Sequence, residues 1–194
     1  MIYRNGGKRL VDLILGISAL ALFAFPILLA ILAVKFSSPG PAFFFQTRVG
    51  RDGRVFRIYK LRTMTVDPER NLGVQTGNTD VGVFACGGFL RRFKIDEFPQ
   101  IFNVIRGDMS IVGPRPCLEE TRDGMPDWAH RRFEVRPGIT GLAQTRGNVV
   151  LSWERRWEQD IQYVDQLSFL LDAWLALKTV MVVILGEEKF GKTN

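Results

Sequence analysis

The feature that most constrains the fold of this chain is a run of 22 residues, 13–34, that carries no charge. As a straight α-helix the run would be ~33 Å long, at ~1.5 Å per residue, and the hydrocarbon core of a bilayer is ~30 Å thick. A signal peptide has a shorter apolar region of ~7–15 residues, and Lys35 follows this run with no pattern of small residues before it. We therefore predict a membrane-associated N-terminal helix, with a cleaved signal peptide as the alternative.

Pro26 lies near the middle of the apolar run and removes one backbone hydrogen bond, so we expect a kink there. Basic residues flank both ends of the run, with Arg4, Lys8 and Arg9 before it and Lys35 after it. The positive-inside rule then favours both ends on the cytoplasmic side. A bent helix that re-enters satisfies both observations. Helices kinked at proline also span membranes, so the residues alone leave both topologies open.

The length of 194 residues predicts one domain of ordinary size with a short appendage. We expect residues 1–36 to form the membrane helix and residues 37–194 to form a compact cytosolic domain docked on the membrane face. The chain has two cysteines, Cys86 and Cys117, and one histidine, His130, for which we assign no role. These counts exclude a disulfide scaffold and cysteine or histidine metal clusters, and they disfavour most histidine-dependent hydrolase mechanisms.

The positive charge is concentrated between residues 35 and 62. This segment contains seven basic residues and one acid, Asp52, which equals the formal net charge of +6 of the whole chain. Such a block indicates an anionic partner: a nucleic acid, an anionic membrane surface or a phosphorylated substrate. A solvated strand face is the simpler alternative. The basic residues are Lys35, Arg48, Arg51, Arg54, Arg57, Lys60 and Arg62.

The pattern along the rest of the chain predicts an α+β fold that is mainly helical. Residues 42–48 and 54–62 are rich in β-branched and aromatic residues and flank a turn at 50–53, so we expect a β-hairpin. We expect helices around 84–93, from near Asp96 and from Ser152 onward. Residues 66–80, 107–117 and 136–148 are predicted to be loops because they are polar or rich in proline and glycine.

The C-terminal segment 167–185 is apolar, but Asp172 and Lys178 interrupt it. We therefore predict an amphipathic helix at the membrane interface rather than a second span. Trp153, Trp157 and Trp174 are candidate anchors in the headgroup region, where tryptophan is enriched.

Two adjacent carboxylates, Asp96 and Glu97, follow Arg91, Arg92 and Lys94 closely in sequence. Helix capping with surface ion pairing is the commoner explanation for such a pair. An aspartate beside a divalent cation and arginines is also a nucleophile for phosphorus, since the cations neutralise the charge of the transition state.

A second cluster places Arg115 between Pro114 and Pro116. The prolines restrict the backbone around a guanidinium that is suited to binding phosphate, with an exposed structural turn as the alternative. The chain contains neither a Walker A loop nor a GxGxxG fingerprint, so nucleotide binding by those routes has no support.

In their order along the chain, these segments resemble the monotopic polyprenol-phosphate phosphoglycosyl transferases, also called the bacterial sugar transferase family, of the small type that holds only the catalytic core. The resemblance covers nearly the whole chain. It rests on residues 8–12, Pro26, residues 40–44, 46–50, 56–64, 95–100, 106–116, 136–144 and 163–165.

The resemblance implies transfer of sugar-1-phosphate from a UDP-sugar to polyprenol (undecaprenyl) phosphate, with release of UMP, through a covalent aspartyl-phosphosugar intermediate. The product would begin the assembly of a membrane glycoconjugate. The implied partners are a UDP-sugar, polyprenol phosphate and a phospholipid membrane, with no nucleic acid and with an oligomer left open. The implied location is the bacterial inner membrane, with the catalytic domain on its cytoplasmic face.

The resemblance also implies roles for single residues. Asp96 would be the nucleophile and a ligand of Mg²⁺, and Glu97 its companion as an acid/base or as an orienting carboxylate. Arg91, Arg115 and Lys60 would bind phosphate. The membrane helix would re-enter, with its break at Pro26.

The chain departs from the family pattern in two places, since Phe25 stands where members often have serine and residues 145–148 differ from the usual run. Two other functions stay open. One is a membrane-anchored protein that binds anionic lipid or nucleic acid through the basic block. The other is a lipid phosphatase, or another phosphoryl transferase, that uses an aspartate as its nucleophile.

Overall fold

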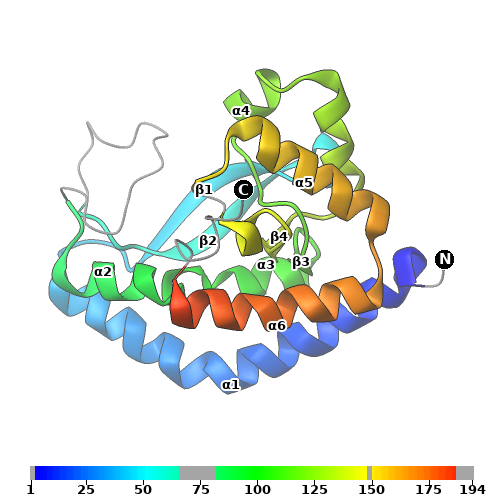
Figure 1. Cartoon of the computed structure of the whole chain (residues 1–194). Coiled ribbons are helices and arrows are strands. Elements are labelled where there is room, and N and C mark those ends of the chain that lie inside the picture. The colour runs from blue at the N-terminus through cyan, green and yellow to red at the C-terminus, as the bar shows by residue number, and fades with distance from the viewer. Residues whose placement is uncertain (1–2, 66–81, 148–149, 187–194) are drawn as a thin grey trace.

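The computed structural model describes residues 3–65, 82–147 and 150–186, and the predicted polar loop at 66–80 lies outside them. This part of the chain is mostly helical, as predicted, and contains two small sheets (Figure 1). The helices are α1 (Lys8–Ser37), α2 (Ala85–Arg92), α3 (Gln100–Arg106), α4 (Glu119–Asp123), α5 (Trp153–Gln166) and α6 (Phe169–Leu185). The strands are β1 (Phe43–Val49), β2 (Val55–Leu61), β3 (Ser110–Val112) and β4 (Gly138–Thr140). Short helical turns are η1 (Tyr3–Gly7), η2 (Arg51–Gly53), η4 (Ile95–Glu97), η5 (Asp127–Glu134) and η6 (Gln144–Arg146).

Helix α1 contains the charge-free run and is, among the described residues, the one helix long and apolar enough to cross a membrane. Pro26 lies inside it, and Figure 1 shows that the helix axis changes direction near its middle. Near its start, Asp12 accepts hydrogen bonds from the Ser110 hydroxyl (2.8 Å) and the Ile111 amide (3.0 Å). The first part of α1 is therefore fixed to the strand β3.

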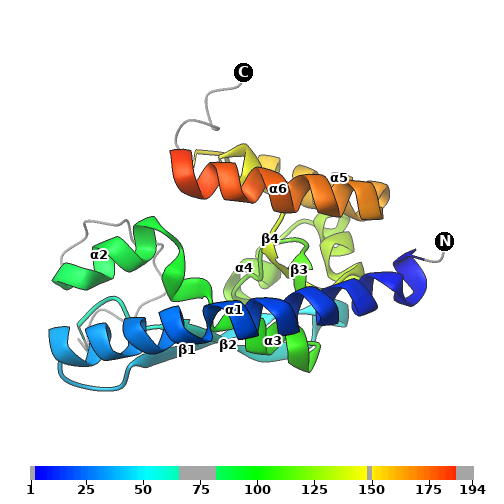
Figure 2. The same cartoon turned by 90° about the horizontal axis from the view of Figure 1, so that it is seen from below.

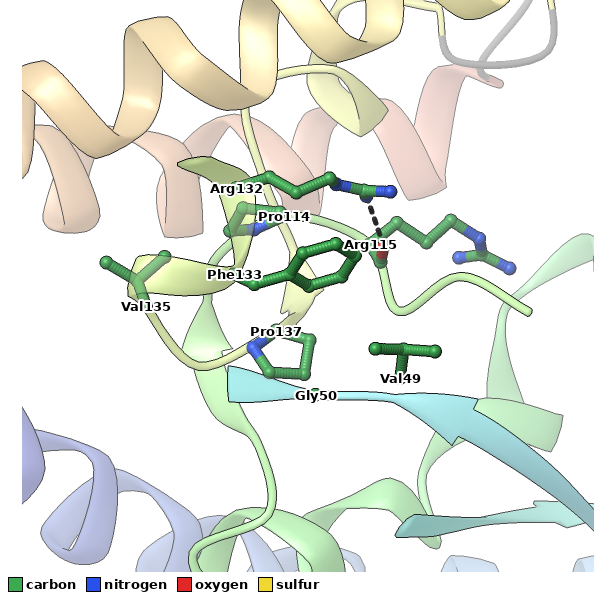
Figure 3. Close-up of a pocket in the computed structure, with 8 residues that line it drawn as sticks. All are labelled: Val49, Gly50, Pro114, Arg115, Arg132, Phe133, Val135 and Pro137. Atoms are coloured by element: carbon green, nitrogen blue, oxygen red, sulfur yellow. Dashed lines mark hydrogen bonds between the residues drawn. The ribbon is translucent and has the colours of Figure 1, made fainter. Parts of the chain in front are cut away.

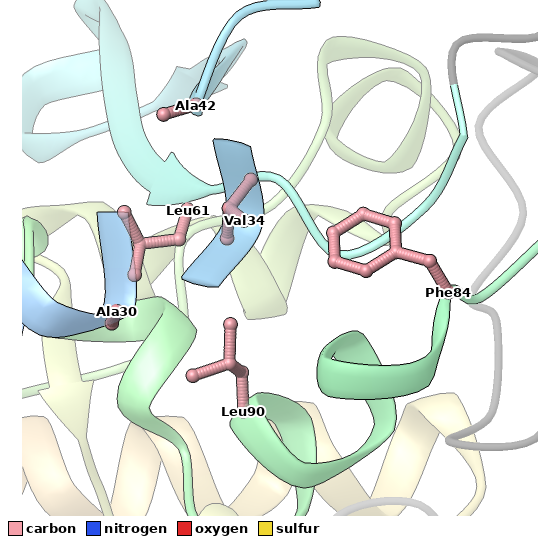
Figure 4. Packing of buried hydrophobic residues seen from close by; sticks show 6 residues of the cluster. All are labelled: Ala30, Val34, Ala42, Leu61, Phe84 and Leu90. Carbon is pink, nitrogen blue, oxygen red and sulfur yellow. The ribbon is translucent and has the colours of Figure 1, made fainter. Parts of the chain in front are cut away.

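The other end of α1 belongs to a hydrophobic core that Figure 4 shows from close by. Ala30 and Val34 pack there against residues of β2 and α2 and the segments that flank them. The cluster consists of Ala30, Val34, Ala42, Leu61, Phe84 and Leu90. Both ends of α1 are thus packed against the same folded body. The division at residue 36 between a membrane helix and a cytosolic domain stays a prediction.

The predicted β-hairpin is confirmed. β1 and β2 pair antiparallel, with Phe44 opposite Lys60 and Arg48 opposite Phe56. Residues opposite each other share one face of the hairpin, so Arg48 and Lys60 lie on the same face. The turn places Asp52 at φ 56° and Gly53 at φ 74°, a backbone conformation that glycine adopts without strain.

Loops dominate 107–117 and 136–148, as predicted, but each range also contains a short strand, β3 and β4, that the sequence did not predict. These strands pair parallel, with Ser110 beside Gly138 and Val112 beside Thr140. The two backbone segments approach so closely that a Cβ on Gly138 would lie 2.1 Å from the Gly113 nitrogen. A strand of three residues is too short to show an alternating pattern in the sequence. The glycines that allow the two backbones to approach are typical of loops as well.

The helix predicted from Ser152 onward is confirmed, since the Ser152 hydroxyl caps α5 by accepting a hydrogen bond from the Arg155 amide. Trp157 is nevertheless buried against Met125 and Ala129, so its assignment as a headgroup anchor is wrong. Figure 1 also shows α5 on the far side of α6 from α1. Trp174 on α6 is 47 % exposed, and its anchoring role stays a prediction.

Helices α1, α2 and α6 share one side of the molecule, which Figure 2 shows from below. Asp172 of α6 joins it to the start of the chain, because its carboxylate accepts hydrogen bonds from Tyr3 and Lys8, each at 2.6 Å. Large apolar side chains are exposed along α1 and α6. They include Leu22, Phe25, Leu28, Leu29, Leu170, Leu177, Val180 and Ile184.

Candidate active site

The two adjacent carboxylates lie in η4, the short turn between α2 and α3. Lys94 precedes this turn at φ 56°, a left-handed conformation that is uncommon for a residue with a side chain. Pro99 caps α3 directly after the turn, near the helix start that the sequence predicted. Asp96 and Glu97 are only 8 % and 7 % exposed. Two adjacent buried carboxylates need compensating partners, which explains the cations around them.

Glu97 is held by two cations from different segments. One of its carboxylate oxygens accepts hydrogen bonds from the Lys60 ammonium of β2 at 2.8 Å and from the Arg115 guanidinium at 3.2 Å. Burial acts to raise the pKa of Glu97, but Lys60 and Arg115 outweigh burial and hold this pKa well below its usual value. Glu97 is therefore ionised at neutral pH. Burial in turn lowers the pKa of Lys60, against the opposing attraction of Glu97.

Asp96 has a different environment. Burial and the neighbouring charge of Glu97 raise its pKa to about 6, while Lys60, Lys94 and Arg91 act in the opposite direction. Its Oδ1 atom is buried and accepts no hydrogen bond. The turn thus places an ionised glutamate, whose charge is balanced by two cations, beside an aspartate. One oxygen of this aspartate has no hydrogen-bond partner and is available to a further ligand.

Arg91 belongs to α2, and its position depends on the residues that follow β2. Its Nε donates a hydrogen bond to the Thr63 hydroxyl at 2.8 Å. Helix α2 lies against this segment so closely that a Cβ on Gly87 would be 2.2 Å from the Thr63 carbonyl oxygen. Arg91 is near enough to lower the pKa of Asp96. All five residues that the sequence singled out as a site are therefore gathered around η4.

Arg115 lies on a loop whose backbone is fixed from behind. Arg132 donates a hydrogen bond to the Arg115 carbonyl at 2.6 Å and forms an ion pair with Asp160 of α5 at 2.8 Å. Both members of this pair are buried. Figure 3 shows Arg132 reaching this carbonyl from above Phe133, while the Arg115 guanidinium points away from Val135 and Pro137.

Arg132 and Asp160 support the site but are not identifiable from the sequence. Burial raises the pKa of Asp160 to about 6 in spite of its partner Arg132. The two residues are 28 positions apart and belong to no recognisable motif, so only their hydrophobic neighbours Phe133 and Tyr163 hinted that this part of the chain is buried.

A small pocket lies beside Glu97 on the side of Arg115. It is lined by Arg48, Ile58, Lys60, Gln100, Arg115 and Pro116. Arg48 entered the sequence analysis only as a member of the basic block. The bridge between Val49 and Cys117 holds the end of β1 against the segment after Arg115, with the Val49 amide 2.9 Å from the Cys117 carbonyl. Because Arg48, Lys60 and Arg115 all line it, the pocket is rich in positive charge.

The described residues contain no group of three or more histidine, cysteine, aspartate or glutamate side chains that could hold a metal ion by themselves. Mg²⁺ is usually held by one or two carboxylates together with water and the phosphates of a substrate. The buried Oδ1 of Asp96, which has no partner, fits this kind of site. The donor set is thus compatible with Mg²⁺ bound together with a phosphorylated substrate.

Comparison with known proteins agrees with this geometry. The family model described as bacterial sugar transferase matches residues 3–186. A protein of Bacillus subtilis (strain 168) named uncharacterized sugar transferase EpsL is 41% identical over 180 residues, which is 93% of this chain and 88% of the relative. The UDP-glucose:undecaprenyl-phosphate glucose-1-phosphate transferase of Caulobacter vibrioides is 43% identical over 192 residues, which is 94% of this chain and 72% of the relative.

Other relatives are longer. The UDP-N-acetylgalactosamine-undecaprenyl-phosphate N-acetylgalactosaminephosphotransferase of Aeromonas hydrophila is 36% identical over 186 residues. The match covers 92% of this chain and 44% of that protein. The relatives thus carry names for different sugars, while this chain corresponds to less than half of the Aeromonas protein.

Proposed function

The chain belongs to the bacterial sugar transferase family, and on that premise we propose that it transfers a sugar-1-phosphate from a UDP-sugar to a polyprenol phosphate, releasing UMP. Membership of the family makes it a transferase enzyme. The observation that carries the proposal is the buried Asp96, which has one oxygen without a partner and lies among cations that suit a phosphorylated substrate. Transfer to a polyprenol phosphate would start the assembly of a membrane glycoconjugate.

Asp96 is the proposed nucleophile. One of its carboxylate oxygens attacks the phosphorus that carries the sugar, a new oxygen–phosphorus bond forms, and the bond from that phosphorus to the bridging oxygen of UMP breaks. UMP leaves with the bridging oxygen and its electron pair. A phosphate oxygen of the polyprenol phosphate then attacks the same phosphorus, and the bond to Asp96 breaks, which restores the carboxylate. The nucleophile must be ionised, and a pKa of about 6 meets this condition above pH 6.

Glu97 acts in this proposal as an orienting carboxylate. It holds the Lys60 ammonium and the Arg115 guanidinium on one oxygen, at 2.8 Å and 3.2 Å. Its pKa, held low by these two cations, makes it a poor proton donor or acceptor near neutral pH. Lys60, Arg115 and Arg91 would neutralise the charge that develops on the transferred phosphoryl group. Cations fixed before the substrate arrives need no reorganisation during the reaction.

Mg²⁺ would be held by Asp96 together with the phosphates of the UDP-sugar, where it would supply charge neutralisation and orientation. Asp96 is the residue that this assignment needs, because one oxygen of Glu97 already has two cationic partners. The buried Oδ1 of Asp96 supports the assignment.

The proposal includes a membrane helix that re-enters. Helix α1 has 30 residues and would be ~45 Å long if straight, which exceeds the ~30 Å of a bilayer core. Asp12 near its start and Val34 near its end are both buried against the same folded body. A spanning helix would carry one end away from that body. The contacts at both ends therefore support insertion of α1 from one side, with the exposed apolar residues of α1 and α6 facing lipid.

We place the folded body on the cytoplasmic face of the inner membrane, because basic residues flank both ends of the apolar run. The bend that Figure 1 shows in the middle of α1 supports a break at Pro26. Phospholipid, polyprenol phosphate and a UDP-sugar are the proposed partners, while a nucleic acid has no part in the proposal.

The test is the release of UMP by the purified full chain in detergent micelles with Mg²⁺, polyprenol phosphate and a panel of UDP-sugars. We expect release with at least one donor by the wild type and none by Asp96→Asn. Incubation with the donor but without polyprenol phosphate should add the mass of one sugar phosphate to the wild-type chain, and later addition of the lipid should remove it. Phosphate release from polyprenol phosphate without any nucleotide sugar would instead favour a lipid phosphatase. No release with any donor would contradict the proposal.

A further inference from the structure

Arg48 is a half-buried cation that forms no ion pair with a carboxylate among the described residues. Its guanidinium donates hydrogen bonds to the Gln46 side chain and, at 3.4 Å, to the Pro116 carbonyl. Its Nε atom is buried and has no hydrogen-bond partner. No ion pair joins Arg48 to an acid in the ranges 3–65, 82–147 and 150–186. A charged group partly removed from water without a paired counter-charge costs free energy, and nearby Glu97 and Glu120 offset only part of that cost for Arg48.

The same pocket holds two further cations, Lys60 and Arg115, which share the single charge of Glu97. Glu97 thus pairs with two of the three cations that line the pocket, and Arg48 forms no ion pair with it. Burial lowers the pKa of Arg48 to about 10, and the nearby charge of Arg115 acts in the same direction. An anion bound in this pocket would relieve both effects. A phosphate is suited to it, because guanidinium groups bind phosphate oxygens in a forked geometry.

The location of the pocket indicates which phosphate it binds. Arg48 is the second-last residue of β1, and Figure 1 shows β1 rising from the level of α2 toward α4 and α5, away from α1. Arg91, on the other side of the carboxylate pair, belongs to α2, which lies beside α1. A lipid phosphate held at the level of α1 and α2 is therefore nearer to Arg91. The pocket at Arg48 lies at the end of β1 that points away from α1, on the side that a water-soluble nucleotide would reach without crossing the level of α1.

We propose that Arg48, with Arg115 and Lys60, forms the binding site for the phosphate that leaves with UMP, and that Arg91 lies on the side of the transferred sugar phosphate and the incoming lipid. The inference rests on the proposed function and deepens it. Asp96 lies between the two sides, so the phosphorus that it attacks would be bound next to the phosphate in the Arg48 pocket. Arg48 is then a substrate-binding residue that neutralises the charge left on UMP.

The test compares Arg48→Gln with Arg54→Gln in the full chain. Arg54 belongs to the same basic block but is exposed and lines neither this pocket nor η4, so it is the matched control. Titration calorimetry with UMP measures binding without turnover. A hydrogen bond to a charged group contributes ~1.5–3 kcal/mol, so we expect Arg48→Gln to weaken UMP binding by ~10- to 100-fold. Arg48→Lys keeps the charge and should lose less affinity than Arg48→Gln. Arg54→Gln should bind UMP as the wild type does.

Steady-state kinetics separates the two phosphate sources. We expect Arg48→Gln to raise the KM for the UDP-sugar and to leave the KM for polyprenol phosphate unchanged. A higher KM for the lipid with unchanged UMP affinity would overturn the inference and assign the pocket to the lipid phosphate. Wild-type UMP affinity in a folded Arg48→Gln chain would also overturn it. Absence of UMP release by the wild type would overturn the proposed function itself, whereas the calorimetric comparison isolates the role of Arg48.

Discussion

Replacement of Asp96 by asparagine should make the protein more stable at neutral pH, although it should abolish activity. The folded protein raises the pKa of Asp96 from 3.8 to about 6, chiefly through burial and then through the charge of Glu97. Each pKa unit corresponds to ~1.36 kcal/mol, so ionised Asp96 costs ~3 kcal/mol of folding free energy at pH 7.5. Asparagine keeps nearly the same shape and carries no charge. Its cost of burial is therefore smaller.

The sign of the pH dependence follows from the raised pKa. Below the unfolded pKa of 3.8, Asp96 is protonated in both states and the cost is absent. Between pH 4 and pH 6 the unfolded chain ionises while the folded chain keeps its proton, so the cost grows as the pH rises. Above pH 6 the full cost is present. The stability difference between Asp96→Asn and the wild type should therefore be small at pH 4 and largest above pH 6.

Thermal unfolding of the full chain in detergent micelles, followed by intrinsic fluorescence, measures this difference. For a chain of this size ~1 kcal/mol shifts the midpoint by ~2–4 °C, so we expect Asp96→Asn to melt ~6–12 °C higher at pH 7.5. Asp52→Asn is the control, because Asp52 is exposed and asparagine is tolerated at its positive φ. It should stay within ~0.5 kcal/mol of the wild type. Equal midpoints for Asp96→Asn and the wild type at pH 7.5, or a difference that persists unchanged at pH 4, would refute the reasoning.

Three further variants test other parts of the site. Glu97→Gln removes the charge that holds Lys60 and Arg115, so the rate of UMP release should fall ~100-fold; retention of the wild-type rate would argue against an orienting carboxylate. Arg132→Met leaves the buried carboxylate of Asp160 without its partner and should destabilise the fold by ~3–5 kcal/mol, as a denaturant titration would measure. An unchanged denaturation midpoint would contradict the importance of that pair. Gly87→Ala places a Cβ 2.2 Å from the Thr63 carbonyl oxygen and should cost ~1–3 kcal/mol by overpacking, measured as a lower melting temperature. Gly124→Ala, whose Cβ would meet no atom closer than 3.6 Å, is its control and should melt close to the wild type.

Much of the fold could be predicted because its signals are local. The charge-free run predicted α1, two segments rich in β-branched and aromatic residues around a glycine turn predicted the hairpin, and Ser152 before a helical pattern predicted the start of α5. The parallel pairing of β3 and β4 could not be predicted. Its residues are 28 apart along the chain, and the close approach of Gly113 and Gly138 is visible only once the two segments meet.

The site divides in the same way. Asp96 and Glu97 are adjacent in sequence, and the resemblance to a family identified Lys60, Arg91 and Arg115. Nothing local marks Arg132, whose hydrogen bond to the Arg115 carbonyl depends on the buried pair with Asp160. The prediction that Trp157 anchors the chain in the headgroup region was wrong. A helical stripe of aromatic residues is compatible both with a membrane interface and with a protein core. Only the packing of η5 against α5 distinguishes the two.

The end of β2 connects α1, the proposed membrane helix, with the proposed chemistry. Lys60 binds Glu97, and two residues later Arg62 donates hydrogen bonds to the carbonyls of Ser38 and Pro39, each at 2.7 Å, where α1 ends. Thr63 then accepts the hydrogen bond from Arg91. A segment of four residues thus contacts the end of α1, the carboxylate of Glu97 and an arginine proposed to bind phosphate. Strand and helix ends are rigid compared with loops. The depth at which α1 sits in the lipid would therefore set the height of Asp96 above the lipid. That height would in turn set the distance from Asp96 to the phosphate of a lipid substrate.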